Sequence, residues 1–160
     1  ILALHAGGAH NRCIGAIGAG QIDRHGNINS TYGADGSFLT GSGGANDIAS
    51  AASEVAVVAA LRPGSLVEKV DYATSPGRAV QSVTTNLGRF EKRDGELVLT
   101  GCVEVAGRDA RSAVDEIRSR CGFALKVADD LELLGAPTAE ELALLRLFDP
   151  DRLFLGRVKA

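Results

Sequence analysis

Two runs of small and apolar residues dominate the hydrophobic pattern of the chain, at residues 13–23 and 55–60. Successive positions in both runs are apolar, which is typical of strands that are buried on both faces of a parallel sheet. The pattern therefore predicts that the two runs are neighbouring strands of one sheet. Residues 66–73 alternate imperfectly between apolar and polar side chains, which predicts a further strand.

The middle of the chain has the pattern of a β-hairpin. Residues 82–87 are rich in β-branched side chains and predict a strand. Asp94-Gly95 lies between the strand-like runs 89–92 and 96–99, and this dipeptide favours a tight turn between two antiparallel strands. We therefore expect residues 81–103 to contain a hairpin.

Two helices are predicted towards the C-terminus. Residues 109–120 carry apolar positions spaced by three and four, which indicates one buried stripe, and Gly122 is a natural C-terminal cap. A short strand is expected at 123–128. Residues 138–141 then form a capping box, and the helix that it opens is expected to end at Pro150. Its apolar side carries Leu142, Leu145 and Phe148.

The stretch at residues 41–47, Gly-Ser-Gly-Gly-Ala-Asn-Asp, is the strongest candidate for a ligand-binding loop. It leads into an Ala-rich segment at 48–53 that is expected to be helical. Backbone N–H groups before a helix have no intrahelical partner and can face an anion or an oxyanion. The alternative is a flexible linker, since Gly/Ser runs are usually linkers. The stretch lacks the Gly-Lys-Ser/Thr ending of a Walker loop and the third glycine of a Rossmann fingerprint.

Residues 24–31, which follow the first predicted strand, are rich in turn formers. Open α/β sheets bind ligands at the carboxyl ends of their strands, so Asn27 and Asn29 are candidate ligand contacts. The alternative for both residues is simple turn chemistry.

Composition and length exclude several classes of protein. With 160 residues, of which 45% are hydrophobic, the chain fits a single domain, which we expect to span residues 1–160. A net charge of -3 argues against nucleic acid as a partner. No apolar run approaches the length of a membrane span, so no membrane association is expected. The N-terminus has no basic region of the kind that begins a signal peptide.

Histidine and cysteine usage suggests no metal site. His5 and His10 are five residues apart and would not share a helical face. The three cysteines are widely spaced and form no CxxC motif, so we expect neither a zinc site nor a disulfide framework, but reduced thiols in the cytoplasm. The chain contains no methionine and begins with Ile1, which favours a segment of a longer protein over a processed product.

Several of these stretches coincide with the motifs of one family, the family I coenzyme A (CoA) transferases. Residues 18–29 resemble its GAxQxDxxGNxN stretch, and residues 41–47 are similar to its GxGGAxD loop. Residues 75–77 with 85–90 resemble its SPG…TxLGVF segment, and residues 122–128 its TGWDLKVA tail. The resemblance extends over roughly residues 14–155. Asn46 fits the beta subunits of the glutaconate CoA-transferase type better than the 3-oxoacid transferases, which have methionine there.

The resemblance implies an α/β fold with an open, mostly parallel sheet flanked by helices, together with a C-terminal β-hairpin and helices. It implies an alpha-subunit partner, separate or fused, and thus a hetero-oligomer, with the chain being the C-terminal portion of a longer beta subunit. It also implies CoA as a substrate and no permanently bound cofactor. In the implied ping-pong reaction, a glutamate carboxylate attacks an acyl-CoA, and the enzyme then carries CoA as a thioester.

The resemblance also implies site residues. The backbone N–H groups of Gly44 and Ala45 would stabilise the thioester oxyanion. The residues implied to bind substrate or CoA are Gln21, Asn27, Ser42, Gly43 and Asn46. The family's nucleophilic glutamate lies in a glutamate-glycine motif upstream of the region where this chain begins, and Glu54, Glu68 and Glu91 are not in that motif.

Other functions remain open on the same fold. They are a CoA-thioester hydrolase, a citrate-lyase-type acyl-carrier transferase, and a non-catalytic subunit that binds acyl-CoA or supports its partner. The acyl donor and acceptor are not specified by the sequence. A segment of such a subunit is expected to leave apolar sheet surface or a sheet edge for another chain, or for a further part of its own chain, to cover.

Overall fold

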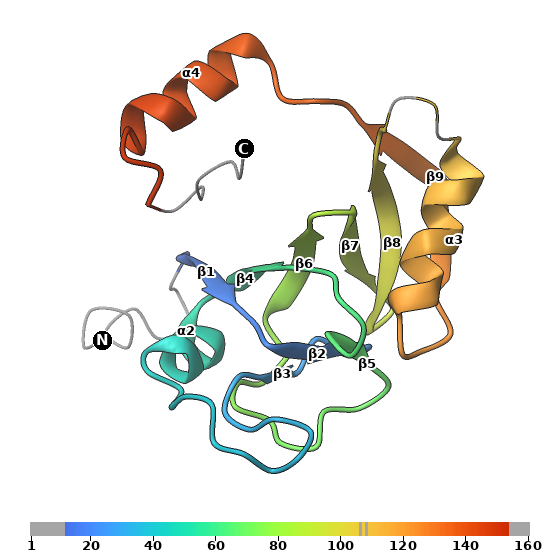
Figure 1. Ribbon diagram of the computed structural model, residues 1–160. Coiled ribbons are helices and arrows are strands. Elements are labelled where there is room, and N and C mark those ends of the chain that lie inside the picture. The colour runs from blue at the N-terminus through green and yellow to red at the C-terminus, as the bar shows by residue number, and fades with distance from the viewer. Residues whose placement is uncertain (1–11, 106, 108, 154–160) are drawn as a thin grey trace.

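The computed structural model describes residues 12–105, 107 and 109–153. In this part of the chain a six-stranded sheet has the order β1-β4-β6-β7-β8-β9 (Figure 1). The pairs β1–β4, β4–β6 and β8–β9 are parallel, and the pairs β6–β7 and β7–β8 are antiparallel. The strands are β1 Ile14–Gly18, β4 Glu54–Ala59, β6 Val80–Thr85, β7 Gly88–Arg93, β8 Glu96–Val103 and β9 Lys126–Leu134. The predicted open, mostly parallel α/β sheet is confirmed.

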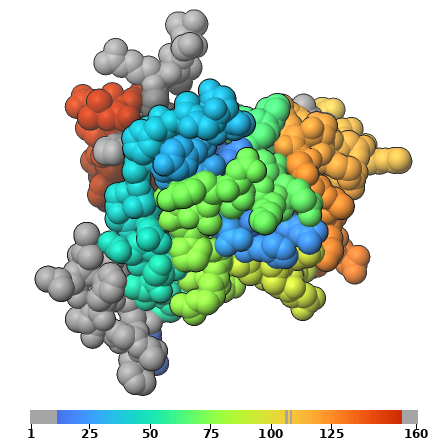
Figure 2. Space-filling view, turned by 90° about the horizontal axis from the view of Figure 1, so that it is seen from below, coloured from blue at the N-terminus to red at the C-terminus, as the bar shows by residue number. Residues whose placement is uncertain are grey.

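A second, three-stranded sheet has the order β3-β2-β5. It contains β2 Gln21–Asp23, β3 Ile28–Asn29 and β5 Leu66–Val67. Ile22, Ile28 and Leu66 from this sheet belong to the same buried core as Val57, Val83 and Phe90 of the larger sheet. In Figure 2 this small sheet and its connecting loops, coloured blue to green, cover one face of the molecule.

The pairing of β1 with β4 confirms that residues 13–23 and 55–60 contribute neighbouring parallel strands. The predicted single strand at 13–23 is nevertheless two strands in different sheets, because the chain turns after Gly18. Burial on both faces was also wrong for the described residues. Ile17, Val55 and Val57 are buried, whereas Ile14 and Val58 are 71% and 64% exposed on the other face.

Local signals identified the hairpin correctly. Asp94 and Gly95 join β7 to β8 with φ values of 52° and 81°, so both residues take the left-handed conformation that a tight hairpin turn requires. The predicted strand at 66–73 is shorter, since β5 ends at Val67. The predicted strand at 123–128 is longer and begins later, since β9 covers Lys126–Leu134.

The helices are α2 Ala45–Ala51, α3 Ala110–Arg120 and α4 Ala139–Phe148. Asp109 is the N-cap of helix α3, and its carboxylate accepts a hydrogen bond from the Ser112 N–H at 2.8 Å. Its buried stripe is Ala113, Val114 and Ile117, as predicted.

Gly122 does not act as the predicted left-handed cap, because α3 ends on Cys121 in an extended conformation. Gly122 instead donates its N–H to the Leu66 carbonyl at 2.8 Å. A Cβ at this position would lie 2.7 Å from that same oxygen. The glycine is therefore required for close backbone approach and not for positive φ.

Helix α4 has the predicted capping box between Thr138 and Glu141. It lies apart from the six-stranded sheet, at the end of the extended connection that follows β9 (Figure 1). No residue of α4 is buried, and Leu147 and Phe148 are 71% and 81% exposed. None of the helices in the described part of the chain is long and apolar enough to cross a membrane.

Candidate functional site

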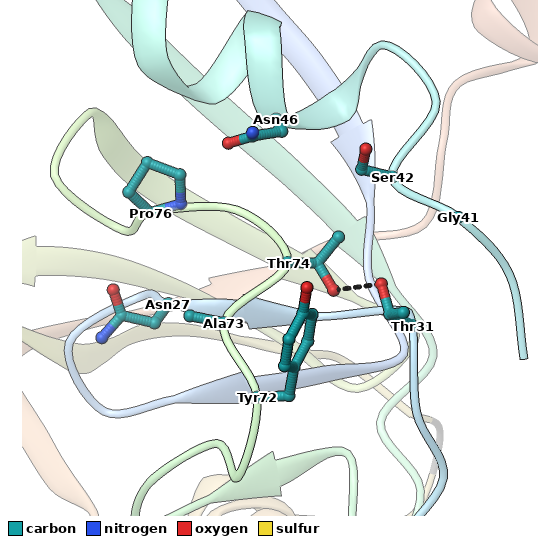
Figure 3. Close-up of a pocket in the computed structure, with 9 residues that line it drawn as sticks. All are labelled: Asn27, Thr31, Gly41, Ser42, Asn46, Tyr72, Ala73, Thr74 and Pro76. Carbon is teal, nitrogen blue, oxygen red and sulfur yellow. Dashed lines mark hydrogen bonds between the residues drawn. The ribbon is translucent and has the colours of Figure 1, made fainter. Parts of the chain in front are cut away.

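Three separate segments enclose a cavity of about 430 Å³ (Figure 3). One segment follows β2, the second is the Gly-rich loop with the start of α2, and the third leads towards β6. The lining residues are Asn27, Thr31, Gly41, Ser42, Asn46, Tyr72, Ala73, Thr74 and Pro76. Three of the stretches that resemble family motifs, 18–29, 41–47 and 75–77, thus contribute to one cavity.

A hydrogen-bond network centred on Asp23 fixes one wall of this cavity. The Asp23 carboxylate is almost completely buried and accepts hydrogen bonds from the backbone N–H groups of His25 and Asn27 and from the Asn27 side-chain amide, each at 3.0 Å. The Asn27 side-chain oxygen accepts a hydrogen bond from the Gly77 N–H at 2.9 Å. Both ends of the Asn27 amide are therefore used in holding the chain, as turn chemistry predicts.

Gly77 brings the third segment against the first. A Cβ on Gly77 would lie within 2.6 Å of backbone atoms of His25, Gly26 and Asn27, so only glycine allows this contact. The Lys92 ammonium donates to the Gly77 carbonyl at 2.6 Å. Burial lowers the pKa of Lys92, and the Asp23 carboxylate partly opposes this shift.

Hydroxyl groups line the same side of the cavity. The Thr31 and Thr74 hydroxyl oxygens are 2.8 Å apart and share a hydrogen bond, and Thr74 also accepts from the Ser30 N–H at 3.0 Å. Tyr72 packs edge-on against Tyr32, with 4.9 Å between the ring centroids. In Figure 3 the hydroxyl end of Tyr72 lies towards the threonine pair, and Asn46 lies across the cavity at the start of α2.

The Gly-rich loop is ordered by its own backbone. Gly43 has a φ of 52°, in the left-handed region that favours glycine, whereas Gly44 has an ordinary φ of −85° and is the N-cap of α2. The Ala45 N–H donates to the Ser42 carbonyl at 3.0 Å. The Gly44 N–H has no acceptor among the described residues. Of the two expected oxyanion donors, Gly44 is therefore the one whose hydrogen is available.

Some of the remaining expected site residues line the cavity, and others lie outside its lining. Ser42 and Asn46 line the cavity; the Asn46 side-chain oxygen accepts a long hydrogen bond of 3.4 Å from the Ser50 hydroxyl. Four expected site residues are not among the lining residues: Gln21, Gly43, Gly44 and Ala45. Gln21 is held by neighbouring segments. Its oxygen accepts from the Asn29 amide at 2.8 Å and its nitrogen donates to the Gly64 carbonyl at 3.3 Å.

A separate groove of about 400 Å³ lies where β1 and β4 end, and residues 18–20 and 58–65 contribute its lining. None of residues 41–47 is in that lining. Gly41, Ser42 and Asn46 line the first cavity instead, together with residues 72–74 and 76.

Sequence reasoning missed Thr31, Tyr72 and Thr74. Tyr72 lay inside a predicted strand, and the threonines carried no spacing signal, since they meet only when residues 43 positions apart come together. The nine lining residues offer hydroxyl, amide and backbone groups but no carboxylate, imidazole, thiol, ammonium or guanidinium. The lining therefore holds no carboxylate nucleophile and no side-chain base that would activate its hydroxyls. No cluster of potential metal ligands occurs within the described residues.

No protein-family model matches the chain. The B subunit of 3-oxoadipate CoA-transferase from Pseudomonas knackmussii is 29% identical over 157 aligned positions, which cover 85% of this chain and 58% of the relative. The B subunit of glutaconate CoA-transferase from Acidaminococcus fermentans is 30% identical over 168 aligned positions, which cover 91% of this chain and 60% of the relative. The crystal structure of the latter enzyme superposes with a TM-score of 0.75 at 28% identity, covering 91% of this chain and 62% of that chain.

This chain is a relative of the CoA-transferase B subunits. The resemblance seen in the sequence motifs is thereby confirmed as a likeness to CoA-transferase B subunits in both sequence and fold. The chain spans about three fifths of the length of these curated relatives. A variant of the decarboxylase AibA/AibB superposes equally well, with a TM-score of 0.75 at 25% identity, covering 96% of this chain and 64% of that chain. The fold of the CoA-transferase relatives is therefore also the fold of a protein that is named a decarboxylase.

Proposed function

We propose that this chain is part of the B subunit of a CoA-transferase that works in the cytoplasm with an A (alpha) subunit. The enzyme moves CoA between an acyl-CoA and a carboxylic acid through a glutamyl-CoA thioester. The relatives supply the reaction class and the expectation of a partner, because both curated proteins are named as B subunits. The two relatives are named for 3-oxoadipate and glutaconate. The proposal extends to the reaction class and not to these particular acids.

The observation that carries the proposal is the cavity at the meeting point of three motif segments. Its wall is fixed by the contacts of Asp23, Asn27 and Gly77, so a bound acyl group would meet a preorganised surface. Gly44 has an N–H without an acceptor among the described residues, and it lies in the chain between Ser42 and Asn46, which line the cavity. A preorganised donor to a thioester oxyanion is worth about 3–4 kcal/mol of transition-state stabilisation.

The nucleophilic glutamate of the proposed reaction is not one of the nine residues that line the cavity. A glutamate carboxylate supplied by further sequence of this subunit or by the A subunit would attack the thioester carbonyl and release CoA as its thiolate, leaving a glutamyl–acyl anhydride. The thiolate would then attack the glutamyl carbonyl, which releases the donor acid as its carboxylate and leaves the glutamyl-CoA thioester. The acceptor carboxylate would reverse these two steps and leave as the new acyl-CoA. This sequence conserves atoms and needs no redox cofactor, because every step is an acyl transfer between oxygen and sulfur. CoA is therefore a substrate and not a resident cofactor.

Decarboxylation is the second candidate, and the equal structural similarity to AibA/AibB supports it. The two reactions differ in what they consume. A transferase requires a free carboxylic acid as CoA acceptor, whereas a decarboxylase releases CO₂ from its substrate without an acceptor.

The distinguishing experiment uses the complete enzyme, purified with its partner. Acyl-CoA is incubated with and without a panel of carboxylic acids, and both the new acyl-CoA and CO₂ are quantified. We expect formation of new acyl-CoA that depends on the added acid, with parallel-line ping-pong kinetics. Release of CO₂ without an acceptor would contradict the transferase and support the decarboxylase. Free CoA as the only product would instead indicate a thioester hydrolase.

The role of the loop is tested with Gly44→Val in the same assay. No atom lies within 4 Å of a Cβ at Gly44 and its φ is ordinary, so the chain is expected to fold normally. The valine side chain would block approach to the Gly44 N–H, and turnover should fall about a hundredfold or more. An unchanged melting temperature with normal turnover would show that the Gly44 N–H is not an oxyanion donor.

A further inference from the structure

We infer that Lys92, which is not one of the residues lining the cavity, is a positioning residue of the candidate site. Its ammonium holds residues 74–77 against residues 23–27, and these two segments supply part of the cavity wall. The inference goes beyond the proposed reaction, because it assigns a task to a charged group that the reaction does not use. It is carried by the direction of Lys92 on β7 and by the contacts of Gly77.

Lys92 faces the interior from a strand whose other charged residues face outward. Successive side chains of β7 alternate between the two faces of the sheet, so Lys92 lies on the same face as the fully buried Phe90. Arg89, Glu91 and Arg93 lie on the opposite face, where Glu91 forms ion pairs with both arginines at 3.3 and 3.6 Å. An ammonium directed inward costs free energy unless it is hydrogen-bonded, so the partner of Lys92 determines what this residue does.

The Lys92 ammonium lies beside both wall segments. It donates to the Gly77 carbonyl at 2.6 Å, and a Cβ on Gly26 would lie 3.4 Å from its nitrogen. Burial lowers the pKa of Lys92, whereas the almost completely buried Asp23 carboxylate favours the charged form of the lysine. Gly77 belongs to one segment and Asp23 and Gly26 to the other, so a single cation stabilises both.

Gly77 is held at each of its backbone groups. Its N–H donates to the Asn27 side-chain oxygen at 2.9 Å, and its carbonyl accepts from Lys92. The Asn27 side-chain nitrogen donates in turn to the Asp23 carboxylate at 3.0 Å. Asn27 and Pro76, which line the cavity from the two segments, therefore lie directly beside the contacts that begin at β7 (Figure 3).

Removing the ammonium should loosen this wall without unfolding the chain. The Gly77 carbonyl would keep a second donor, because the Val80 N–H lies 3.0 Å from it. The lost hydrogen bond is charge-assisted, however, and such bonds are stronger than neutral ones. We therefore expect residues 74–77 to separate more often from residues 23–27. The cavity would then be less preorganised for a ligand.

Hydrogen exchange measured by mass spectrometry on the complete enzyme tests the Lys92–Gly77 contact directly. Lys92→Met keeps most of the length of the side chain and removes its charge and its donors. The N–H groups of Thr74, Ser75 and Gly77 are hydrogen-bonded to residues 27 and 28, so opening of the wall exposes them to exchange. Their exchange should become about tenfold faster or more, while the exchange of α3 stays unchanged.

Lys126→Met is the matched control for this measurement. Lys126 also lies on the sheet, at the exposed start of β9, and forms an ion pair with Glu96. The substitution removes the same charge but no contact of Gly77. Exchange at residues 74–77 should therefore equal that of the unmodified enzyme.

Kinetics test whether the contact positions the site, and this part rests on the proposed function. CoA transfer is measured at equal concentrations of folded enzyme, so that a loss of stability alone does not change the result. We expect kcat/KM of Lys92→Met to fall about tenfold or more, and that of Lys126→Met to stay unchanged. Lys92→Arg should recover most of the loss, because it keeps the charge and an N–H donor.

A double-mutant cycle tests whether Lys92 acts through Gly77. Asn27→Ala removes the contact on the other side of the same glycine. Because both residues hold one group, Lys92→Met should lower kcat/KM less in the Asn27→Ala enzyme than in the unmodified enzyme. Independent, multiplicative losses would contradict action through Gly77.

The outcomes separate the positioning role from the proposed function. Unchanged exchange at residues 74–77 in Lys92→Met, or an equal change in Lys126→Met, overturns the inference. Faster local exchange with unchanged kcat/KM shows that Lys92 only supports the fold, and overturns the positioning role while CoA transfer stands. Absence of transfer in the unmodified enzyme overturns the proposed function, and hydrogen exchange still decides whether Lys92 holds the wall.

Discussion

At the scale of single residues, two adjacent glycines in the loop before α2 meet different physical requirements. Gly43 has a left-handed φ of 52°, whereas Gly44 has an ordinary φ of −85°; a Cβ at either position would meet no atom within 4 Å. Sequence alone cannot distinguish them, since both belong to the same Gly-Gly pair. The left-handed backbone therefore favours glycine at Gly43, whereas the role of Gly44 as a ligand contact stays a prediction.

Alanine substitutions should separate these roles. Gly43→Ala forces an L-residue into the left-handed region and is expected to lower the free energy of unfolding by about 1–2 kcal/mol. Gly44→Ala, at an ordinary φ with no close neighbour, should cost less than about 1 kcal/mol. Urea titration of both variants measures the difference. Equal losses would mean that the loop does not hold Gly43 in this conformation.

At the scale of secondary structure, elements specified by neighbouring residues were predictable and those specified by distant contacts were not. The Asp94-Gly95 hairpin, the buried stripe of α3 and the Thr138 capping box all depend on residues a few positions apart. The division of residues 13–23 between two sheets depends on pairing with β4 and β5, which lie far along the chain.

The sequence likewise predicted only part of the candidate site. Ser42 and Asn46 were expected from the loop motif and do line the cavity. The cavity's other polar residues, Tyr72 and the threonine pair, are brought together by long-range packing and carry no local signal. Motif spacing located the loop, but only the fold shows which groups lie opposite it.

Helix α3 provides a pH-dependent test at this scale. Hydrogen bonds from the Ser112 hydroxyl and N–H lower the pKa of the Asp109 carboxyl. Its ionised form therefore stabilises the fold above the pKa of the unfolded chain, and this contribution is lost as the pH falls through the lower folded-state pKa. Relative to Asp109→Asn, the unmodified protein should lose its stability advantage between about pH 5 and pH 2, as measured by urea unfolding. A difference that stays constant over this range would contradict the assignment.

At the scale of the whole molecule, apolar side chains are exposed on two elements. β1 is an outer strand of the sheet and exposes Ile14, and the adjacent strand β4 exposes Val58 further along the same face. α4 exposes Leu144, Leu147 and Phe148. Exposed apolar side chains that gather into a patch mark a surface for another chain, or a further part of the same chain, to cover. That these two surfaces are covered in the complete protein stays a prediction.

The 160-residue chain on its own should therefore self-associate. Light scattering after size-exclusion chromatography is expected to give a mass that rises with protein concentration. Replacing both Leu147 and Phe148 with glutamate should reduce this association, because it places charge on the most exposed part of α4. A concentration-independent monomer before substitution would show that these surfaces need no cover.

We propose that the complete enzyme transfers CoA through an enzyme-bound glutamyl thioester. The most direct measurement is intact-protein mass spectrometry of the complete enzyme after brief mixing with acyl-CoA, followed by peptide mapping. We predict a CoA adduct on a glutamate that disappears when a carboxylic acid acceptor is added, and that forms more slowly in Gly44→Val. Turnover of acyl-CoA without any adduct at any mixing time, together with CO₂ release that needs no acceptor, would contradict the account.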